Sequence, residues 1–279
     1  MMPVIHTLPP VLERYELKYI IPWEYVEPIS EFLKLYCSLD YYSEQAADDN
    51  YFYKVTSLYF DSPNYELLRQ RIEGKATRFN MRVRAYGDGE SAPYFLEVKN
   101  CLGISGVVKK YRATANEAQW PHILTDPGFR ADESDTSAEK ANKELFLRLA
   151  ISYAVEPKIL TKYQRRAFFS TVDQYARVTM DANMQYRREH EYTICSNYGM
   201  TNYDNETIYA NNTHSEVGVI LELKCRVGEV PYWMLDLIKR FNLTQVGFSK
   251  YVNSVMVSHY DNGDWFMSSD REPSYAFYK

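Results

Sequence analysis

Charged and apolar residues alternate along several stretches of this chain, and this spacing is typical of β-strands that have two different faces. In residues 14–18, RYELK, an arginine, a glutamate and a lysine occupy every second position, with a tyrosine and a leucine between them. The same alternation recurs in residues 79–86, 94–100, 106–113, 177–183 and 219–227. We predict that each stretch is a strand with one charged face and one apolar face.

Other stretches predict further strands, helices and loops. Two more strands are predicted over residues 55–60 and 157–170. Apolar residues at helical spacing predict helices over residues 23–35, 65–73, about 138–154 and 231–242, and at the start of the tail from residue 247. Glycine-bearing turns at residues 87–89 and 103–106 join consecutive strands, which predicts antiparallel pairing. An acidic polar stretch at 126–139 and an Asn-, Tyr- and Thr-rich stretch at 188–216 are predicted to be a linker and a long hairpin or loop.

The charged faces are mostly basic, with single carboxylates between the cations. Taken alone, each strand fits an antiparallel sheet with one solvated face. Taken together, the strands segregate basic residues in a chain whose formal net charge is -5. If the sheet closes into a barrel with its apolar face outward against helices, the charged residues line the lumen, where their repulsion is tolerable when a polyanion or counterions fill it. The residues that share these faces are Arg14, Glu16, Lys18, Arg82, Arg84, Glu97, Lys99, Lys110, Arg112, Arg177, Thr179, Asp181, Glu222, Lys224 and Arg226.

Length and composition narrow the class of protein. The 279 residues, 46% of them hydrophobic, predict one globular domain over 1–279, with a core of about 11–255 and a tail of 256–279. The negative charge speaks against a nucleic-acid binder. No apolar run is long enough for a membrane span, and the first residues lack the pattern of a signal peptide, so we expect a cytoplasmic protein.

Arginine and lysine converging from several strands are suited to phosphate oxygens, since arginine offers a planar fork of donors and lysine a point charge. The glutamates between them are suited to Mn²⁺ or Mg²⁺, which bind carboxylate oxygen and bridge phosphates. None of the five histidines has the pattern of an acid and base pair, and they are interpreted as surface or packed core residues.

The ordered series of motifs resembles a known family. RYELKY, SLYFDSPNY, RVRAY, LEVK, the V-x-K-x-R ending at Arg112, the Y-x-R-x-A-F from Tyr163, RVTMD, LELK and FSKY together resemble the VTC domain, the polyphosphate polymerase branch of the triphosphate tunnel metalloenzymes. The resemblance runs from about residue 11 to about residue 255. It implies an α+β fold in which an antiparallel tunnel barrel of about eight strands, flanked by helices, binds ATP or another nucleoside triphosphate with a metal. The implied activity moves the γ-phosphate onto a growing inorganic polyphosphate chain.

The resemblance also implies roles for single residues. Its phosphate-binding basic positions match Lys18, Arg82, Arg84, Lys99 and Arg165, and further basic positions match Lys110, Arg112 and Lys250. Arg14 and Lys224 join the substrate-binding set because they share the charged faces, and Tyr163 matches a tyrosine beside the substrate. Glu222 matches the metal-binding glutamate, with Glu16 and Glu97 at further glutamate positions. Periodicity alone leaves Arg165 and Arg166 equivalent, and the resemblance selects Arg165.

Two other functions remain open. The first alternative is a tunnel-fold hydrolase of inorganic or organic triphosphates, a class that resembles this chain but has an E-x-E-x-K motif in its first strand. Here Arg14 stands at the first glutamate position, and Glu13 is one residue away and falls on the other face of the strand. A non-catalytic binder of polyphosphate or inositol phosphates needs the basic lumen without a metal carboxylate, so Glu222 favours an enzyme. The larger family members that act at membranes add a phosphate-sensing domain and a transmembrane domain, which these 279 residues do not match, so product translocation is not assigned to this chain.

Overall fold

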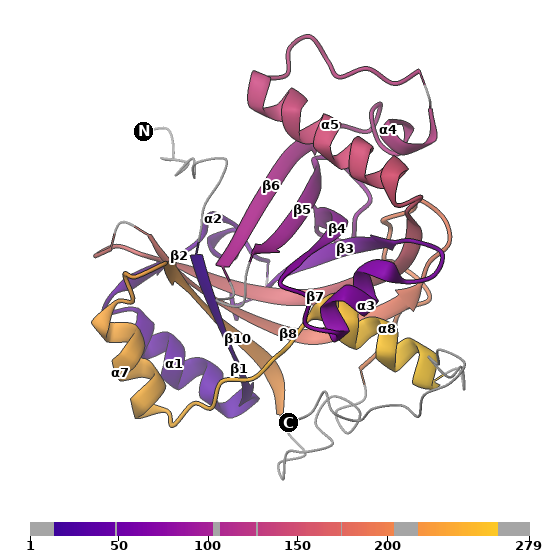
Figure 1. The fold of residues 1–279 in the computed structure, drawn as a ribbon. Helices are drawn as coiled ribbons and strands as arrows, with labels where there is room; N and C mark the ends of the chain where they lie inside the picture. The colour runs from indigo at the N-terminus through magenta and orange to yellow at the C-terminus, as the bar shows by residue number, and fades with distance from the viewer. Residues whose placement is uncertain are drawn as a thin grey trace.

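Eight antiparallel strands form a closed ring in the computed structural model, which describes residues 14–47, 49–102, 107–126, 128–173, 175–203 and 217–261 (Figure 1). In the order of the ring, these strands are β7 (Glu156–Ser170), β3 (Tyr53–Asp61), β4 (Thr77–Tyr86), β5 (Tyr94–Leu102), β6 (Val107–Ala115), β1 (Arg14–Pro22), β10 (Val217–Arg226) and β8 (Ala176–Arg188). Strand β8 pairs back with β7, which closes the ring. The junction of β1 and β6 is the thinnest, since in the described chain these strands meet at the single pair Arg14 and Val108.

The register of the strands brings the charged residues to the inward face of the ring, which we call the lumen. Lys18 lies opposite Glu222 across β1 and β10, and Glu222 lies opposite Thr179 on β8. On the other side, Glu97 on β5 lies between Arg82 on β4 and Arg112 on β6. Because side chains alternate between the two faces of a strand, this register also turns the apolar residues outward. The predicted antiparallel tunnel barrel with a charged lumen and flanking helices is therefore confirmed.

Helices cover the outward face of the ring and bury its apolar residues. A 3₁₀ turn (η1, Trp23–Tyr25) leads into α1 (Val26–Leu33), which packs beside α7 (Tyr232–Arg240) over β1, β8 and β10 (Figure 1). Helix α5 (Ser137–Ser152) begins at a capping box of Thr136 and Glu139 and packs on β5 and β6, together with the short α4 (His122–Thr125). Residues such as Met180, Leu221 and Val83 are completely buried in these outer cores.

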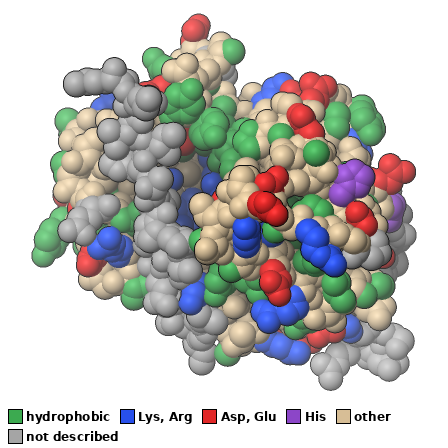
Figure 2. All heavy atoms as spheres, turned by 90° about the horizontal axis from the view of Figure 1, so that it is seen from above, with side chains coloured by type: hydrophobic (Ala, Val, Ile, Leu, Met, Phe, Trp, Pro, Cys, Tyr) green, Lys and Arg blue, Asp and Glu red, His purple; other side chains and the backbone are tan. Residues whose placement is uncertain are grey.

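One end of the ring is closed by α8 (Lys250–Asp261). Its Tyr251 stacks on Tyr59 of β3 with ring centroids 5.4 Å apart, and the Tyr251 hydroxyl donates a 2.5 Å hydrogen bond to Asp61. Asp61 in turn accepts hydrogen bonds from the first backbone N–H groups of α3 (Glu66–Ile72), at 2.9 Å from Leu67 and 2.8 Å from Leu68. Two segments far apart in sequence are thereby fixed to the same end of β3. Seen from above in Figure 2, the molecule is hollowed, and Lys and Arg side chains lie inside the hollow.

Several details differ from the sequence predictions. The helix predicted from residue 231 begins after Pro231, which is the N-cap of α7, and this helix flanks the ring while α8 closes it. Short elements escaped the sequence analysis because they are too brief to show a period: β2 (Cys37–Leu39), α2 (Tyr41–Glu44), α4 and β9 (Thr201–Asn202). The turn predicted at 103–106 and most of the predicted loop at 204–216 lie outside the described residues. None of the described helices has the length and apolarity needed to cross a membrane.

Candidate functional site

The first cluster of charges in the lumen surrounds Glu97, whose side chain is only 1% exposed. Arg82 donates to its Oε2 from Nε at 2.8 Å and from Nη2 at 2.6 Å. Lys110 and Arg112 donate to Oε1 at 2.5 Å and 2.7 Å. Burial alone raises the pKa of Glu97, but Lys110 and the arginines hold this pKa well below its ordinary value. Glu97 is therefore an ionised counter-ion that pairs with three basic side chains on neighbouring strands, and it opposes the burial that lowers the pKa of Lys110 well below its ordinary value.

A second cluster joins β1 and β10. Glu222 contacts Lys224 at 2.8 Å and Lys18 at 3.7 Å, and Glu16 pairs with Arg14 at 3.0 Å and with Lys99. Burial lowers the pKa of both Lys18 and Lys224 to about 8, despite the neighbouring carboxylates. Burial would raise the pKa of Glu16, but Lys99 and Arg14 bring it down to about 2. Glu16 is therefore ionised near neutral pH, and Lys18 and Lys224 lose their protons as the pH rises through about 8.

A third cluster lies near α8 and centres on Asp181 of β8. Arg165 binds this carboxylate through two hydrogen bonds of 2.6 Å and 2.8 Å, and Lys250 from α8 contacts it at 2.5 Å. The Tyr163 ring lies beneath both cations, 5.3 Å from the Arg165 guanidinium and 4.7 Å from the Lys250 ammonium. The Tyr163 hydroxyl accepts a 3.1 Å hydrogen bond from Arg84. Helix α8 thus contributes a cation to the lumen as well as closing its end.

Some buried polar atoms of the lumen have no hydrogen-bond partner among the described residues. They are Arg84 Nε, Ser57 Oγ and Thr179 Oγ1, and all three side chains are at most 5% exposed. Arg84 also forms no ion pair with any carboxylate in the described chain, in contrast to Arg82 beside it. Because buried donors are nearly always paired in folded proteins, such groups indicate a place where a ligand or water supplies the partner.

The lumen as a whole is cationic. Its carboxylates are Glu16, Glu97, Asp181 and Glu222. Its cations are Arg14, Lys18, Arg82, Arg84, Lys99, Lys110, Arg112, Arg165, Lys224 and Lys250. Each carboxylate already contacts at least two cations, so the excess positive charge is left without a partner of opposite sign. An elongated polyanion is the kind of ligand that would best neutralise this excess positive charge.

The fit of a divalent metal differs between the carboxylates. Glu222 lies close enough to Glu16 across β1 and β10 to raise the pKa of Glu16, and the oxygens of both are the ligand type that Mg²⁺ and Mn²⁺ prefer. Glu97 is enclosed by three cations and fits the role of a counter-ion better. In the described part of the chain, no three His, Cys, Asp or Glu side chains gather into a metal site. A metal at Glu222 and Glu16 would therefore need further oxygens from a bound phosphate.

The structure brings every residue of the predicted site to the lumen, while their roles in binding and catalysis stay predictions. Arg165 and Arg166 are separated as the resemblance implies: Arg166 points outward and donates to Glu27 at 2.7 Å and to Ser30 at 2.9 Å. The sequence analysis gave no role to Asp181, Ser57 or Thr179. Asp181 and Thr179 stand on the predicted charged face of their strand, which was the available signal, whereas Ser57 lies in a strand with no charged face.

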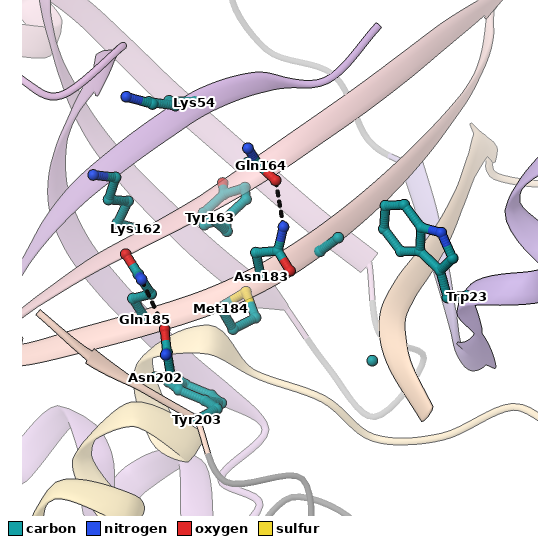
Figure 3. Close-up of a pocket in the computed structure, with 12 residues that line it drawn as sticks. Trp23, Lys54, Lys162, Tyr163, Gln164, Asn183, Met184, Gln185, Asn202 and Tyr203 are labelled. Atoms are coloured by element: carbon teal, nitrogen blue, oxygen red, sulfur yellow. Dashed lines mark hydrogen bonds between the residues drawn. The ribbon is translucent and has the colours of Figure 1, made fainter. Parts of the chain in front are cut away.

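A second hollow lies on the opposite face of β7 and β8, and we call it the outer groove (Figure 3). It measures about 610 Å³, and its lining includes Trp23, Lys54, Lys162, Gln164, Asn183, Gln185 and Asn202. Its amides bind one another, Gln185 to Asn202 at 2.7 Å and Asn183 to Gln164. Lys54 and Lys162 both contact Asp88, at 2.7 Å and 2.6 Å. The polar groups of the outer groove thus largely satisfy each other.

The fold and the site define a ring of antiparallel strands around a cationic lumen. The chain belongs to the VTC domain family, whose model matches residues 13–259. No curated protein matches the chain. Among solved structures, a candidate adenylate cyclase from Bacillus halodurans is 12% identical, with 86% of this chain and 96% of that chain covered at a TM-score of 0.49. A candidate adenylyl cyclase from Hippeastrum, reported with a dominant triphosphatase activity, is also 12% identical, with 91% and 97% covered at a TM-score of 0.44.

Proposed function

We propose that this protein is a polyphosphate polymerase that transfers the γ-phosphate of ATP, or of another nucleoside triphosphate, onto a growing inorganic polyphosphate chain inside the lumen. The observation that carries the proposal is the excess of buried cations over carboxylates, together with the unpartnered Nε of Arg84. Membership of the VTC domain family supports it. A chain of phosphates offers evenly spaced negative oxygens, and such a ligand matches cations that converge from several strands.

Phosphoryl transfer needs little covalent chemistry from a protein, since positioning and charge neutralisation supply most of the rate. In our proposal, Arg82, Arg84, Arg165, Lys18 and Lys99 hold the triphosphate. Before substrate binds, carboxylates such as Glu97 hold these cations in place. Bound phosphate oxygens then replace the carboxylates as partners of the cations. The remaining lumen cations bind the acceptor chain: Arg14, Lys110, Arg112, Lys224 and Lys250.

A divalent ion, Mn²⁺ or Mg²⁺, held by Glu222 and Glu16 would supply charge neutralisation between phosphates. The acceptor phosphate is already ionised, so the reaction needs no general base. The histidines in the described chain agree with this, since His122 lies on α4, His190 follows β8, and His259 lies on α8 beside Tyr65 and Arg188. The proposed role of the residues is therefore to align two phosphates and neutralise the charge between them.

The direct test is phosphorus NMR of the purified protein with ATP and Mn²⁺, followed over time with and without a short polyphosphate primer. We expect an internal-phosphate resonance to grow as ADP forms, faster with the primer. Orthophosphate without internal phosphate would assign the protein to the triphosphate hydrolases instead. An unchanged spectrum with tight triphosphate binding would leave a binding module.

Substitution of the proposed metal carboxylate separates turnover from binding. Glu222→Gln should reduce ADP formation by about a hundredfold or more, because the amide binds a divalent cation poorly. Binding of tripolyphosphate in EDTA, measured by calorimetry, should persist because the cations remain. The matched control is Glu229→Gln, since Glu229 is exposed in the turn after β10 and contacts Arg226 at 3.9 Å. Equal turnover in both variants would contradict the role of Glu222.

A further inference from the structure

Aromatic side chains form an arc at the end of the ring opposite α8. Tyr53 begins β3, Tyr86 ends β4 and Phe95 stands at the start of β5, while Tyr42 comes from α2. The Tyr42 and Tyr86 rings are stacked with centroids 4.1 Å apart, and the Tyr86 and Phe95 rings meet edge to face at 5.5 Å. Strand β3 runs from Tyr53 in this arc to Tyr59 beneath α8, which places the arc at the end that α8 leaves open.

The arc presents an exposed aromatic corner. Tyr42 is 38% exposed although its ring also stacks on Tyr86. Tyr41, 59% exposed, stands nearly perpendicular to Tyr42 at 78°, with centroids 5.6 Å apart. Asp40 fixes this corner, because it accepts hydrogen bonds from the Ser43 backbone N–H at 2.9 Å and from the Tyr53 hydroxyl at 3.2 Å. The Tyr42 ring thus lies beside the nearly perpendicular Tyr41 ring, and both belong to the four-residue helix α2.

The corner is continuous with the phosphate-binding cations of the lumen. Arg112 links the two regions: it donates to Glu97 in the lumen, and its guanidinium lies 4.5 Å from the centroid of Phe95 in the arc. Its side chain is 39% exposed. On the other side of the arc, Tyr53 lies opposite Arg165 in the register of β3 and β7. Arg112 and Arg165 thus both border the arc, so a ligand whose phosphates contact either arginine can reach the aromatic corner with its other end.

From this geometry we propose that the Tyr41–Tyr42 corner is the binding site for the base of the nucleoside triphosphate. The inference rests on the proposed function, since it concerns the donor nucleotide of that reaction. A base has a flat π-face that stacks on tyrosine, and a neighbouring arginine adds to such stacking. A phosphate chain has no flat face and gains nothing from the corner. The corner thus distinguishes a nucleotide from inorganic polyphosphate, which the cations of the lumen alone do not.

The test compares nucleoside triphosphates that differ only in the base with tripolyphosphate, which has no nucleoside. Calorimetry in EDTA, where no turnover occurs, gives dissociation constants for ATP, GTP, CTP and inorganic tripolyphosphate. Wild type should bind ATP and GTP several-fold more tightly than CTP, because purines offer a larger stacking area. Tyr42→Ala should weaken the binding of ATP by about tenfold and remove the preference for purines. It should change the dissociation constant of tripolyphosphate less than twofold. Tyr42→Phe should keep the wild-type values, as should Tyr232→Ala, a control at an 87% exposed tyrosine on α7.

The other outcomes separate this inference from the proposed function. Equal affinity of wild type for ATP, GTP and CTP would overturn the base site, while tight binding of tripolyphosphate would leave the proposed function standing. An equal loss of affinity for ATP and for tripolyphosphate in Tyr42→Ala, with a lower melting temperature, would show that Tyr42 only holds α2 in place. This outcome would also overturn the base site. Binding of neither ligand to wild type would remove the proposed function and the base site together.

Discussion

The lumen and the outer groove are opposite faces of the same two strands, and both contain basic residues in a hollow. On β7, Lys162 and Gln164 line the outer groove, while Arg165 points into the lumen. Tyr163 borders both, since it lines the outer groove and accepts a hydrogen bond from Arg84 in the lumen. In the outer groove, two lysines share Asp88 and the amides bind one another. In the lumen, cations exceed carboxylates and Arg84 has no carboxylate partner among the described residues. The two faces of one strand therefore differ in whether every cation has a carboxylate partner among the described residues.

This difference is the basis on which we propose the lumen, rather than the outer groove, as a polyanion site. Basic residues alone do not indicate a polyanion site, because each lysine of the outer groove already has a carboxylate partner in Asp88. Buried cations in excess of the carboxylates around them do indicate one, because the excess charge has lost hydration without gaining an anion that compensates it. Such an arrangement destabilises the ligand-free fold and is relieved when an anion binds. Variants in the outer groove therefore serve as controls for variants in the lumen.

The largest difference is expected for cations on the two faces. Arg84→Met should weaken the binding of tripolyphosphate by about a hundredfold, because a buried arginine makes charge-assisted hydrogen bonds to the anion. Its melting temperature should be unchanged or higher, since the lumen loses an unpaired positive charge. Lys162→Met should leave binding within twofold of wild type. Calorimetry with tripolyphosphate and thermal unfolding of both variants check this, and equal effects of the two substitutions would show that the faces do not differ.

The next prediction concerns the balance inside the lumen. Glu97→Gln should lower the free energy of unfolding by about 3 kcal/mol, because it leaves Arg82, Lys110 and Arg112 buried without their shared carboxylate. The same change should tighten tripolyphosphate binding by about tenfold, because Glu97 no longer competes with phosphate for these cations. Urea unfolding with and without tripolyphosphate measures both effects.

The control for Glu97 is Asp88→Asn in the outer groove, since this carboxylate also holds two cations but is 22% exposed. This substitution should lower the free energy of unfolding by less than about 1 kcal/mol and leave the binding of tripolyphosphate unchanged. If Glu97→Gln weakens binding in EDTA, the idea that this carboxylate competes with phosphate is wrong. If instead it weakens only the Mn²⁺-dependent reaction, Glu97 acts as a metal ligand, as the family resemblance suggested.

Much of the fold could be predicted because strands with one charged face have a strict period of two. The same period assigned Lys18, Arg82 and Lys99 to one face. Closure of the ring could not be derived from it, because an open sheet with a solvated face has the same pattern, and here the family resemblance decided. It also separated Arg165 from Arg166, which alternate on a strand that is polar on both faces.

The rest of the site could not be predicted, because its geometry depends on contacts between distant segments. Asp181 meets Lys250 only when α8 closes the ring, and nothing local in either segment encodes that contact. Tyr42 reaches Tyr86 from a helix of four residues, too short for any periodic signal. The excess of charge in the lumen likewise became visible only when the partners of each cation were known.

The smallest expected effect concerns pH and the two lysines whose pKa burial lowers to about 8, Lys18 and Lys224. Both are mostly protonated at pH 7 and lose their protons as the pH rises through 8, so tripolyphosphate binding in EDTA should weaken by about fivefold between pH 7 and 8.5. The contribution of these lysines to the stability of the ligand-free protein has the opposite sign. Between pH 8 and about 10.5 the unfolded chain binds more protons than the folded one, so this contribution rises with pH.

The comparison of the two faces sharpens this pH test. Lys18→Arg should flatten the pH dependence of binding, because the guanidinium does not titrate in this range. Lys54→Arg in the outer groove should leave it as in wild type. Calorimetry at pH 7, 7.5, 8 and 8.5 with the three proteins is sufficient. A wild-type affinity that does not change over this range would mean that the lysines of the lumen keep their protons or do not touch the anion, and the arginines alone would then define the site.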